Sequence, residues 1–290
     1  MALGQEVREG CAAIARDARS VRIDLDALEA LEPGPPPELD PQRHYLEGRA
    51  HDVAAYLLTL DAINFGSGWF PTLKKRAGCS GYFTVSWALA DRWRAGAGWS
   101  NAELRAMRTE EVADTLGQRR DHELMSLFAQ ALRELGRFLG DRHVLDVIAA
   151  AGGSAQRFGR ALADGMAMWH DDGFYKRAQI AGSDLELAGV APFTDIEALT
   201  IFADNLVPHV LRCEGVLVYA DDLAAQIESG RLLGPGRAER EIRASAVHAC
   251  AQLARRAGMT ERDLDNALWH RGQREEYKVR PRHRTRTIFY

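Results

Sequence analysis

Three segments of the chain combine residue types that could bind a flat ring, bind an anion or stabilise a positive charge. The first runs from Asp61 to Phe65 and continues to Trp69, where two glycines and a proline end a predicted helix. Aromatic side chains in such a loop can hold a flat heterocycle between them. The alternative is that Phe65 and Trp69 are ordinary core residues, because aromatic side chains are usually buried.

The second segment places two cations next to each other. It reads G-F-Y-K-R-A-Q-I over residues 173–180 and includes Lys176 and Arg177. Successive residues of a helix point about 100° apart, so the two side chains cannot both enter one pocket. We expect one of them to bind an anion while the other faces solvent. A fully solvated pair is the alternative.

The third segment ends an apolar run with a carboxylate. Asp204 follows the run from Leu199 to Ala203 and precedes Pro208, which indicates a break between helices. A buried acid is costly unless it is hydrogen-bonded or paired, so Asp204 is a candidate functional group. The alternative is that Asp204 caps the following helix. Asp195 could equally cap a helix that begins at Ile196.

Helical periodicity predicts the elements that position these segments. Apolar residues recur at three- and four-residue steps through most of the chain. Ser100 to Glu103 reads as a capping box, and Ser154 as a cap of the helix that follows it. Only residues 216–219 and 287–290 suggest strands. We therefore predict an all-α, compact multi-helix domain with helices over residues 7–21, 47–64, 82–93, 104–116 (short helices), 122–139, 144–151, 155–162, 174–187, 196–203, 208–214, 221–229, 237–256 and 260–269.

The first part of the chain differs from the rest. Half of the 10 prolines lie between Pro33 and Pro41, which indicates an extended connector. This connector could be a domain boundary, but the helix before it is too short for a core of its own. We expect a single domain over residues 1–290, with residues 1–43 forming an N-terminal helix and a Pro-rich connector that wraps a surface.

Composition excludes several classes of protein. The 290 residues are 46% hydrophobic and 27% charged, as in globular proteins. No apolar run is long enough to cross a membrane, and the first residues do not resemble a signal peptide. A formal net charge of -4 argues against a stable nucleic-acid complex, although residues 271–290 hold seven Lys and Arg against two Glu. Four separated cysteines suit a reducing cytoplasm, where we expect the protein to work.

Generic motifs for metal, nucleotide or nucleophile chemistry are absent. The nine histidines never adopt the H-x-x-x-H or H-E-x-x-H spacing of metal sites, and no C-x-x-C pair occurs. The chain also lacks a phosphate loop, a dinucleotide fingerprint and a G-x-S-x-G turn. From the residues alone, the sequence predicts a helical protein with a possible small-molecule site.

The three segments carry a resemblance to a known family. The blocks F-Y-K-R-A-Q-I and L-T-I-F-A-D are specific, and shorter matches keep similar spacing around them. From about Tyr45 to Tyr290 the sequence resembles the queuosine salvage proteins, the queuosine 5'-phosphate N-glycosylases. The shorter matches are at Asp61, Asn64, Phe65, residues 80–82, Val207, Pro208, Gly215, Leu217, Tyr219, residues 241–243, Leu268, Trp269, His283, Arg284, Arg286, Ile288 and Tyr290.

The resemblance implies a fold and a reaction. The fold is similar to that of the helix-hairpin-helix DNA glycosylases. The reaction is hydrolysis of the bond between queuine, a 7-deazaguanine base, and the ribose of queuosine 5'-monophosphate. No metal or organic cofactor is expected, and the partners are the substrate and the product queuine.

The resemblance also implies roles for individual residues. Asp204 matches the Asp of the F-A-D block and would stabilise the oxocarbenium-like ribose as the base leaves. Phe65 and Trp69 would stack on the base, with Asn64 and Asp195 accepting its hydrogen bonds. The phosphate needs cations: Lys176 first, Arg177 second, and the tail residues Arg284 and Arg286. After Asp204 the family has Tyr-Arg, whereas this chain has Asn205-Leu206.

Three alternatives remain open from the residues. A DNA base-excision glycosylase would share the fold but would need a large basic face. A non-catalytic module would bind queuine or a nucleotide through the aromatic loop without turning it over. A purely structural helical protein would not bring Phe65, Lys176 and Asp204 into a pocket.

Overall fold

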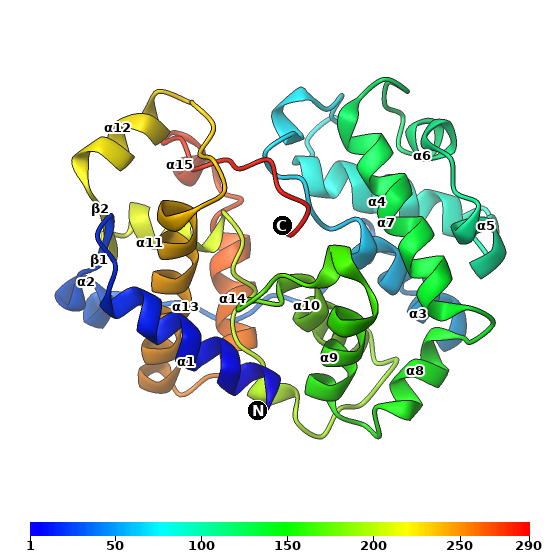
Figure 1. Cartoon of the computed structure of the whole chain (residues 1–290), viewed down its shortest axis with the longest axis horizontal. Coiled ribbons are helices and arrows are strands. Elements are labelled where there is room, and N and C mark those ends of the chain that lie inside the picture. Colours follow the sequence, from blue (N-terminus) through cyan, green and yellow to red (C-terminus); the bar gives the residue numbers. More distant parts are fainter. The chain divides into compact units, whose positions relative to one another are not determined.

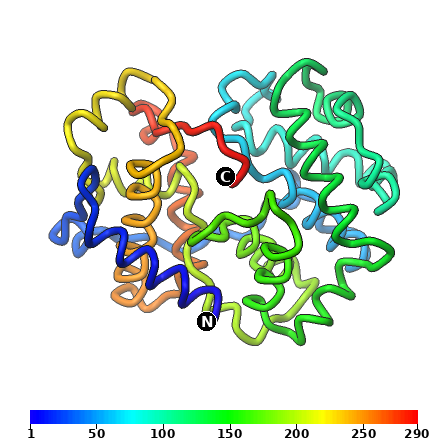
Figure 2. The backbone as a smooth tube through the Cα atoms, viewed as in Figure 1, coloured from blue at the N-terminus to red at the C-terminus, as the bar shows by residue number.

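The Pro-rich connector lies where the chain leaves one compact unit and enters another. The computed structural model describes all 290 residues (Figure 1). Unit 1 comprises Met1–Pro37, Asp172–Lys176 and Glu197–Thr287, and unit 2 comprises Glu38–Asp171, Arg177–Ile196 and Ile288–Tyr290. The red end of the tube in Figure 2, Ile288–Tyr290, is thus part of unit 2. Both units are built from segments that are far apart in the sequence.

Unit 1 is organised around its longest helix, α13. Its Ile242, Ala246, Cys250 and Leu253 are all buried, which confirms the apolar stripe of the predicted helix. Helix α1 packs along α13 (Figure 1), as do α11 and α14. The helices of this unit are α1 (Leu3–Arg16), α2 (Leu25–Ala30), α11 (Val207–Cys213), α12 (Asp221–Glu228), α13 (Arg237–Ala257), α14 (Glu261–Arg271) and α15 (Glu275–Lys278).

A two-stranded antiparallel ribbon completes unit 1. It pairs β1 (Val21–Ile23) with β2 (Leu217–Tyr219), so that Val21 lies opposite Tyr219. The predicted strand near Val216 is confirmed, but the first helix ends at Arg16 and does not reach Val21. The carboxylate of Glu241 accepts the backbone N–H groups of Arg19 and Ser20, which ends the helical hydrogen bonding there. Residues 287–290, also predicted as a strand, form none.

Unit 2 is a cluster of helices around the amphipathic α7, whose apolar face is fully buried. Helix α3 packs against α7 and α8, and α5 packs against α7 (Figure 1). The elements are α3 (Ala50–Ala62), η1 (Phe70–Thr72), α4 (Gly81–Arg94), α5 (Asn101–Arg105), α6 (Thr109–Thr115), α7 (Glu123–Leu139), α8 (Val144–Ala150), α9 (Ala155–Gly165) and η2 (Ala167–Trp169). Helix α10 (Lys176–Leu187) begins with the last residue of a unit 1 segment and continues in unit 2.

The helix caps expected from the sequence are present in unit 2. Ser100 and Glu103 form a capping box at α5, in which each side chain accepts a hydrogen bond from the other residue's backbone N–H. The Ser154 side chain accepts from the N–H of Arg157 at the start of α9. These confirmed caps and the helix positions support the predicted mostly helical fold.

The helix predicted over residues 196–203 is wrong beyond Ala198. Only the 3-10 turn η3 (Ile196–Ala198) forms, and residues 199–203 are irregular and buried. Side chains from distant elements take up the backbone hydrogen bonds that a helix would satisfy internally. Arg8 donates to the carbonyl of Leu199 at 3.1 Å, and Asp265 accepts the N–H of Phe202 at 2.8 Å. This segment is therefore held by unit 1 rather than by its own turns.

None of the helices combines the length and apolar character that crossing a lipid bilayer requires. The similarity to helix-hairpin-helix DNA glycosylases stays a prediction.

Candidate functional site

Asp204 is a carboxylate with one oxygen held and one oxygen available. Its Oδ1 accepts the backbone N–H groups of Leu206 at 2.7 Å and Val207 at 3.2 Å, at the start of α11. Its Oδ2 forms no hydrogen bond, and the side chain is partly exposed. The alternative that Asp204 caps the next helix is thus correct for Oδ1. It leaves Oδ2 free to act on a ligand, so the structural and the chemical interpretations are compatible.

The backbone on both sides of Asp204 is fixed by buried side chains. Arg243, on α13, donates from Nε to the carbonyl of Ala203 at 2.9 Å. Asn205, the next residue, donates to the carbonyl of His283 at 3.0 Å and is itself buried. These bonds fix the direction of the Asp204 side chain, because they hold the residues before and after it.

A cation faces Asp204 from the basic tail. Burial lowers the pKa of Arg282, and the negative charge of Asp204 opposes that shift. Arg282 is therefore close enough to Asp204 for the two charges to attract each other. Sequence reasoning gave no role to Arg243 or Arg282. Arg243 belongs to the match at residues 241–243, and Arg282 belongs to the basic tail, so both signals were present in the sequence.

The F-Y-K-R block enters α10 through a strained residue. Tyr175 has φ of +50°, the one non-glycine residue in this left-handed region. Such a conformation costs free energy in a bulky residue and persists only where neighbours enforce it. The Tyr175 hydroxyl donates to Glu6 of α1 at 2.8 Å, while the Arg243 guanidinium lies 3.9 Å from the centre of the Phe174 ring. Arg243 thus connects this block with the backbone next to Asp204.

Lys176 and Arg177 are both buried, with 5% and 1% of their surface exposed. The expectation that one of them faces solvent is wrong, and so is the alternative of a solvated pair. The reason is that α10 is buried around most of its circumference, since residues 176–179 and 181–183 are all buried. A difference of 100° in direction therefore does not bring either side chain to solvent.

The two predicted tail cations differ from each other. Arg284 donates to the carbonyl of Gly230 at 2.6 Å, and its own carbonyl accepts the N–H of Leu233. It therefore fastens the tail to the loop after α12. Arg286 is exposed and lies two residues further along. Lys176, Asp204, Arg284 and Arg286 all belong to unit 1.

The aromatic loop, defined here as Asn64–Phe70, follows α3 in unit 2. Phe65 is 1% exposed and packs edge-on against Phe128, with 5.0 Å between the ring centres. Trp69 is also buried and donates from its indole N–H to Glu123 at 2.7 Å. Asn64 is partly exposed. In this structure the two aromatic residues therefore pack in the unit as core residues do, and Asn64 is more accessible.

Gly66 permits the turn of the aromatic loop. Its φ of +94° is favourable only for glycine, and an added Cβ would come within 2.5 Å of the Leu124 side chain. Its N–H donates to the backbone oxygen of Tyr290 at 2.9 Å. The segment Ile288–Tyr290 therefore holds the loop through a backbone contact.

Arg177 also contacts this loop, and the residues before it, through its guanidinium. Nη1 donates to the carbonyl of Ala62 at 2.5 Å, and Nη2 donates to the carbonyls of Met168 and Ile288. The guanidinium carbon also lies 4.8 Å from the centre of the Phe65 ring. Burial lowers the pKa of Arg177 to about 10, which leaves it protonated near neutral pH. The structure thus brings Asn64, Phe65 and Arg177 together.

Asp195 lies at a helix start instead. It accepts hydrogen bonds from the Ser154 hydroxyl, the Ala155 N–H and the Gln156 amide, at 2.6, 2.6 and 3.2 Å. Burial alone would raise the pKa of Asp195, but these hydrogen bonds outweigh it and lower the pKa. Asp195 thus stabilises the start of α9, rather than a helix beginning at Ile196.

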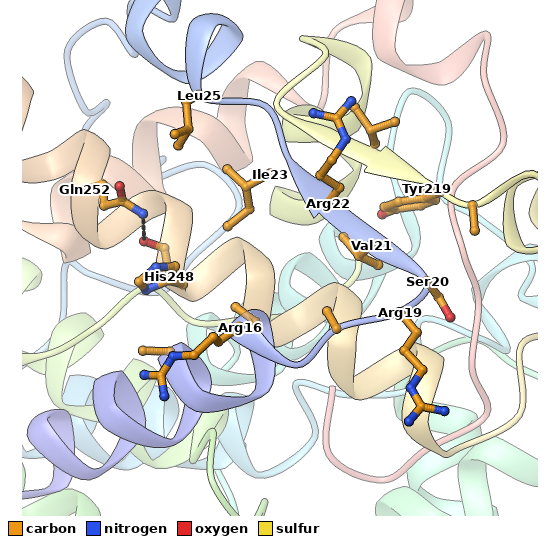
Figure 3. A pocket seen from close by; sticks show the side chains of 15 residues that line it. Arg16, Arg19, Ser20, Val21, Arg22, Ile23, Leu25, Tyr219, His248 and Gln252 are labelled. Atoms are coloured by element: carbon orange, nitrogen blue, oxygen red, sulfur yellow. Dashed lines mark hydrogen bonds between the residues drawn. The ribbon is translucent and has the colours of Figure 1, made fainter.

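A separate pocket of about 810 Å³ lies in unit 1 between α1, the ribbon and α13. Figure 3 shows Arg16 near His248 at one end, while Arg19 and Arg22 point away from its centre. None of the predicted site residues lines it. The structure contains no group of three or more His, Cys, Asp or Glu side chains placed to hold a metal ion.

Comparison with known proteins supplies independent information. A family model described as "Queuosine salvage protein" matches residues 43–290. A protein of Sphaerobacter thermophilus is 32% identical over 96% of this chain and 95% of its own length, and a protein of Mus musculus is 29% identical over 98% of both. A protein of Bos taurus is 30% identical over 98% of both. Each of these relatives is named "Queuosine 5'-phosphate N-glycosylase/hydrolase".

Proposed function

Because this chain belongs to the queuosine salvage protein family, we propose that it hydrolyses the N-glycosidic bond of queuosine 5'-phosphate and releases queuine. Water adds across that bond: its hydroxyl goes to ribose C1', and its proton goes to the nitrogen of the leaving base. The named relatives match nearly the whole chain, which supports the complete reaction rather than binding alone.

The mechanism rests on one observation: the two oxygens of the Asp204 carboxylate have different environments. As the base leaves, C1' gains positive charge, and a fixed carboxylate lowers the free energy of that transition state. Oδ1 is held by two backbone N–H groups, and Oδ2 has no protein partner. A preorganised carboxylate needs little reorganisation during the reaction.

The base is proposed to bind at the aromatic loop. Queuine has an N–H and an amine on one edge, so its recognition needs a hydrogen-bond acceptor. Asn64 is a partly exposed polar residue at the start of the loop, whereas Phe65 and Trp69 are buried beside it and would have to become accessible to stack on the base. Asp195 was predicted as a second acceptor, but three protein groups already donate to its oxygens. We therefore assign base recognition to Asn64.

The phosphate is proposed to bind to Lys176, with Arg284 and Arg286 supplying further positive charge. Lys176 is nine-tenths or more buried, and a buried ammonium attracts an anion more strongly than an exposed one. Arg177 was predicted as the second phosphate ligand. It is left out here because its guanidinium is occupied by three backbone carbonyls.

The test is chromatographic detection of queuine after incubation with queuosine 5'-phosphate, with Asp204→Asn as the comparison. The asparagine amide oxygen can still accept from Leu206 and Val207, so the start of α11 should persist. Loss of the charge should lower kcat by about 10²–10⁴-fold. A circular dichroism spectrum and an unfolding midpoint equal to those of the native protein are the control.

Release of queuine by both proteins would keep the function and remove Asp204 from its centre. Tight queuine binding without release by either protein would favour a non-catalytic binding module. We also propose a cytoplasmic location, because all four cysteines carry free thiols.

A further inference from the structure

We infer that Arg177 positions the aromatic loop for base binding and does not bind the substrate phosphate. This rests on the proposed function, since it concerns how the same substrate is recognised. The inference starts from the contacts of one guanidinium. Both of its terminal nitrogens donate to backbone carbonyls. Arg177 forms no ion pair with a carboxylate.

The three carbonyls belong to three different segments. Ala62 is the last residue of α3, Met168 lies in the 3-10 helix η2, and Ile288 lies in the final segment of unit 2. Because the planar guanidinium has donors in fixed directions, it sets the relative positions of these three backbones. Ala62 is two residues before Asn64, so the start of the loop is fixed directly.

The same guanidinium also contacts aromatic rings. It lies 4.8 Å from the Phe65 ring centre and 5.1 Å from the Trp169 ring centre, within the range of cation–π attraction. Phe65 is therefore held between Arg177 and Phe128. Because Phe65 is fixed in the core of unit 2, the loop that continues from it is ordered in advance, which lowers the entropy lost when a ligand binds there.

The segment Ile288–Tyr290 closes this arrangement. Its Ile288 carbonyl accepts from Arg177, and its Tyr290 backbone oxygen accepts from the Gly66 N–H. Arg177 thus contacts Phe65 of the aromatic loop and the carbonyl of Ala62 just before it, and the segment that Arg177 binds holds the loop at Gly66. Loss of either partner should release the loop in the same way.

Phosphate binding at Arg177 would disturb this arrangement. Nη1 and Nη2 already donate to carbonyls, and only Nε has no partner. An anion would have to reach this Nε inside a side chain that is 1% exposed, and a bidentate contact with Nη1 or Nη2 would weaken a bond to a carbonyl. Lys176, the preceding residue, is the buried cation to which the proposed function gives the phosphate. The contacts of Arg177 therefore assign it to the loop, which leaves the phosphate to Lys176 as in the proposed function.

The experiment measures kcat and KM for queuosine 5'-phosphate and for unphosphorylated queuosine with Arg177→Met and Arg177→Lys. A positioning role predicts that kcat/KM falls by the same factor for both substrates, on the order of 10² for the methionine variant. The ratio between the two substrates should then stay at the native value. Inhibition by inorganic phosphate should also be unchanged, whereas inhibition by queuine should weaken.

A loss confined to the phosphorylated substrate, or weaker inhibition by phosphate, would overturn the inference. Lys176→Met is the comparison expected to show that selective loss. Arg142→Met is the matched control for general effects. Arg142 also donates to two carbonyls, of Phe138 and Leu139, and lies 5.3 Å from a phenylalanine ring centre, but it is exposed and away from the loop.

A variant lacking residues 288–290 keeps the inference testable if Arg177→Met does not fold. It retains Arg177 and should show the same pattern: weaker queuine inhibition and an unchanged substrate ratio. If the native protein binds queuine without cleaving the nucleotide, the proposed function fails, and calorimetric queuine affinities of the same variants still decide the inference. If the native protein neither cleaves nor binds, both are overturned.

Discussion

Each unit holds a buried arginine that donates to a backbone carbonyl close to a predicted site residue. The two arginines differ in what compensates their positive charge. In unit 1, Arg243 binds the Ala203 carbonyl and lies 3.5 Å from the carboxylate of Glu239. In unit 2, Arg177 binds three carbonyls and has no carboxylate in ion-pair distance. Arg243 is therefore half of a charge pair, while Arg177 is a cation solvated by protein dipoles.

The difference shows two ways of fixing a loop with one side chain. A paired arginine such as Arg243 connects the Ala203 carbonyl to a buried carboxylate on its own helix, Glu239. An unpaired arginine such as Arg177 connects several backbones at once, because each carbonyl it binds replaces part of its lost hydration. Burial still lowers the pKa of Arg177 to about 10, and the carboxylates of Asp171, Glu134 and Asp61 oppose that shift from a distance.

The largest expected effect is from Arg243→Met. Both Arg243 and Glu239 are buried, so the substitution leaves an uncompensated carboxylate and should lower the free energy of unfolding by about 3–5 kcal/mol. Urea denaturation checks this. A second variant, Arg243→Met with Glu239→Gln, should recover part of the loss. Equal stability of the single and double variants would show that the pair is not what distinguishes Arg243.

A smaller effect is expected from Arg177→Met. The substitution removes donors from buried carbonyls and leaves no charge behind, so the free energy of unfolding should fall by about 1–3 kcal/mol. The same denaturation measurement applies. A loss as large as that of Arg243→Met would break the distinction between a charge pair and a cation held by dipoles.

The smallest effect concerns acid sensitivity, which unit 1 should show through His209 and His283. Burial lowers the pKa of His209 to about 4, although its bond to the Tyr277 carbonyl opposes this. Burial also lowers the pKa of His283 to about 3, reinforced by the charges of His209, Arg243, Arg282 and Arg212. Both imidazoles are therefore neutral in the folded protein at neutral pH.

The sign of the pH effect follows from the unfolded state. An unfolded histidine binds a proton below its ordinary pKa of 6.5, whereas these two do so only near pH 4 and 3. Their contribution is complete above pH 6.5 and is lost progressively below it, by about 1 kcal/mol each on going from pH 6.5 to 5.5. Unfolding midpoints across this range test it. His209→Gln should flatten the profile, and substitution of the exposed His51 should not.

Local patterns predicted most of the helices, because periodicity and caps act within a few residues. The capping box at Ser100 and the cap at Ser154 are of this kind. The irregular segment 199–203 was not predictable in this way. Its backbone bonds go to Arg8, Arg243 and Asp265, and no pattern near residue 200 indicates that these side chains arrive there.

For the proposed site, the sequence indicates candidates and the structure supplies their contacts. Asp204 could be selected from its block and from the break at Pro208, and the structure supplies the detail that one oxygen remains available. The burial of Arg177 and its three carbonyl partners could not be read from spacing, because two of these partners are distant in the sequence. The hydrogen bond from the Ala155 N–H at the start of α9 to Asp195 likewise joins residues about forty positions apart, so spacing does not predict it.

Because one oxygen of Asp204 caps α11 and the other is available to a ligand, few residue types could replace it. Capping the start of α11 is a task that asparagine, serine or threonine can share, since each offers an oxygen at the required distance. The role proposed for Asp204, stabilising a positive ribose, needs a charged oxygen as well. Glutamate also has a charged oxygen, but its side chain is one methylene longer than the side chain that caps α11 here. Under the proposed function, we therefore expect no single substitution at position 204 to preserve both the start of α11 and the reaction.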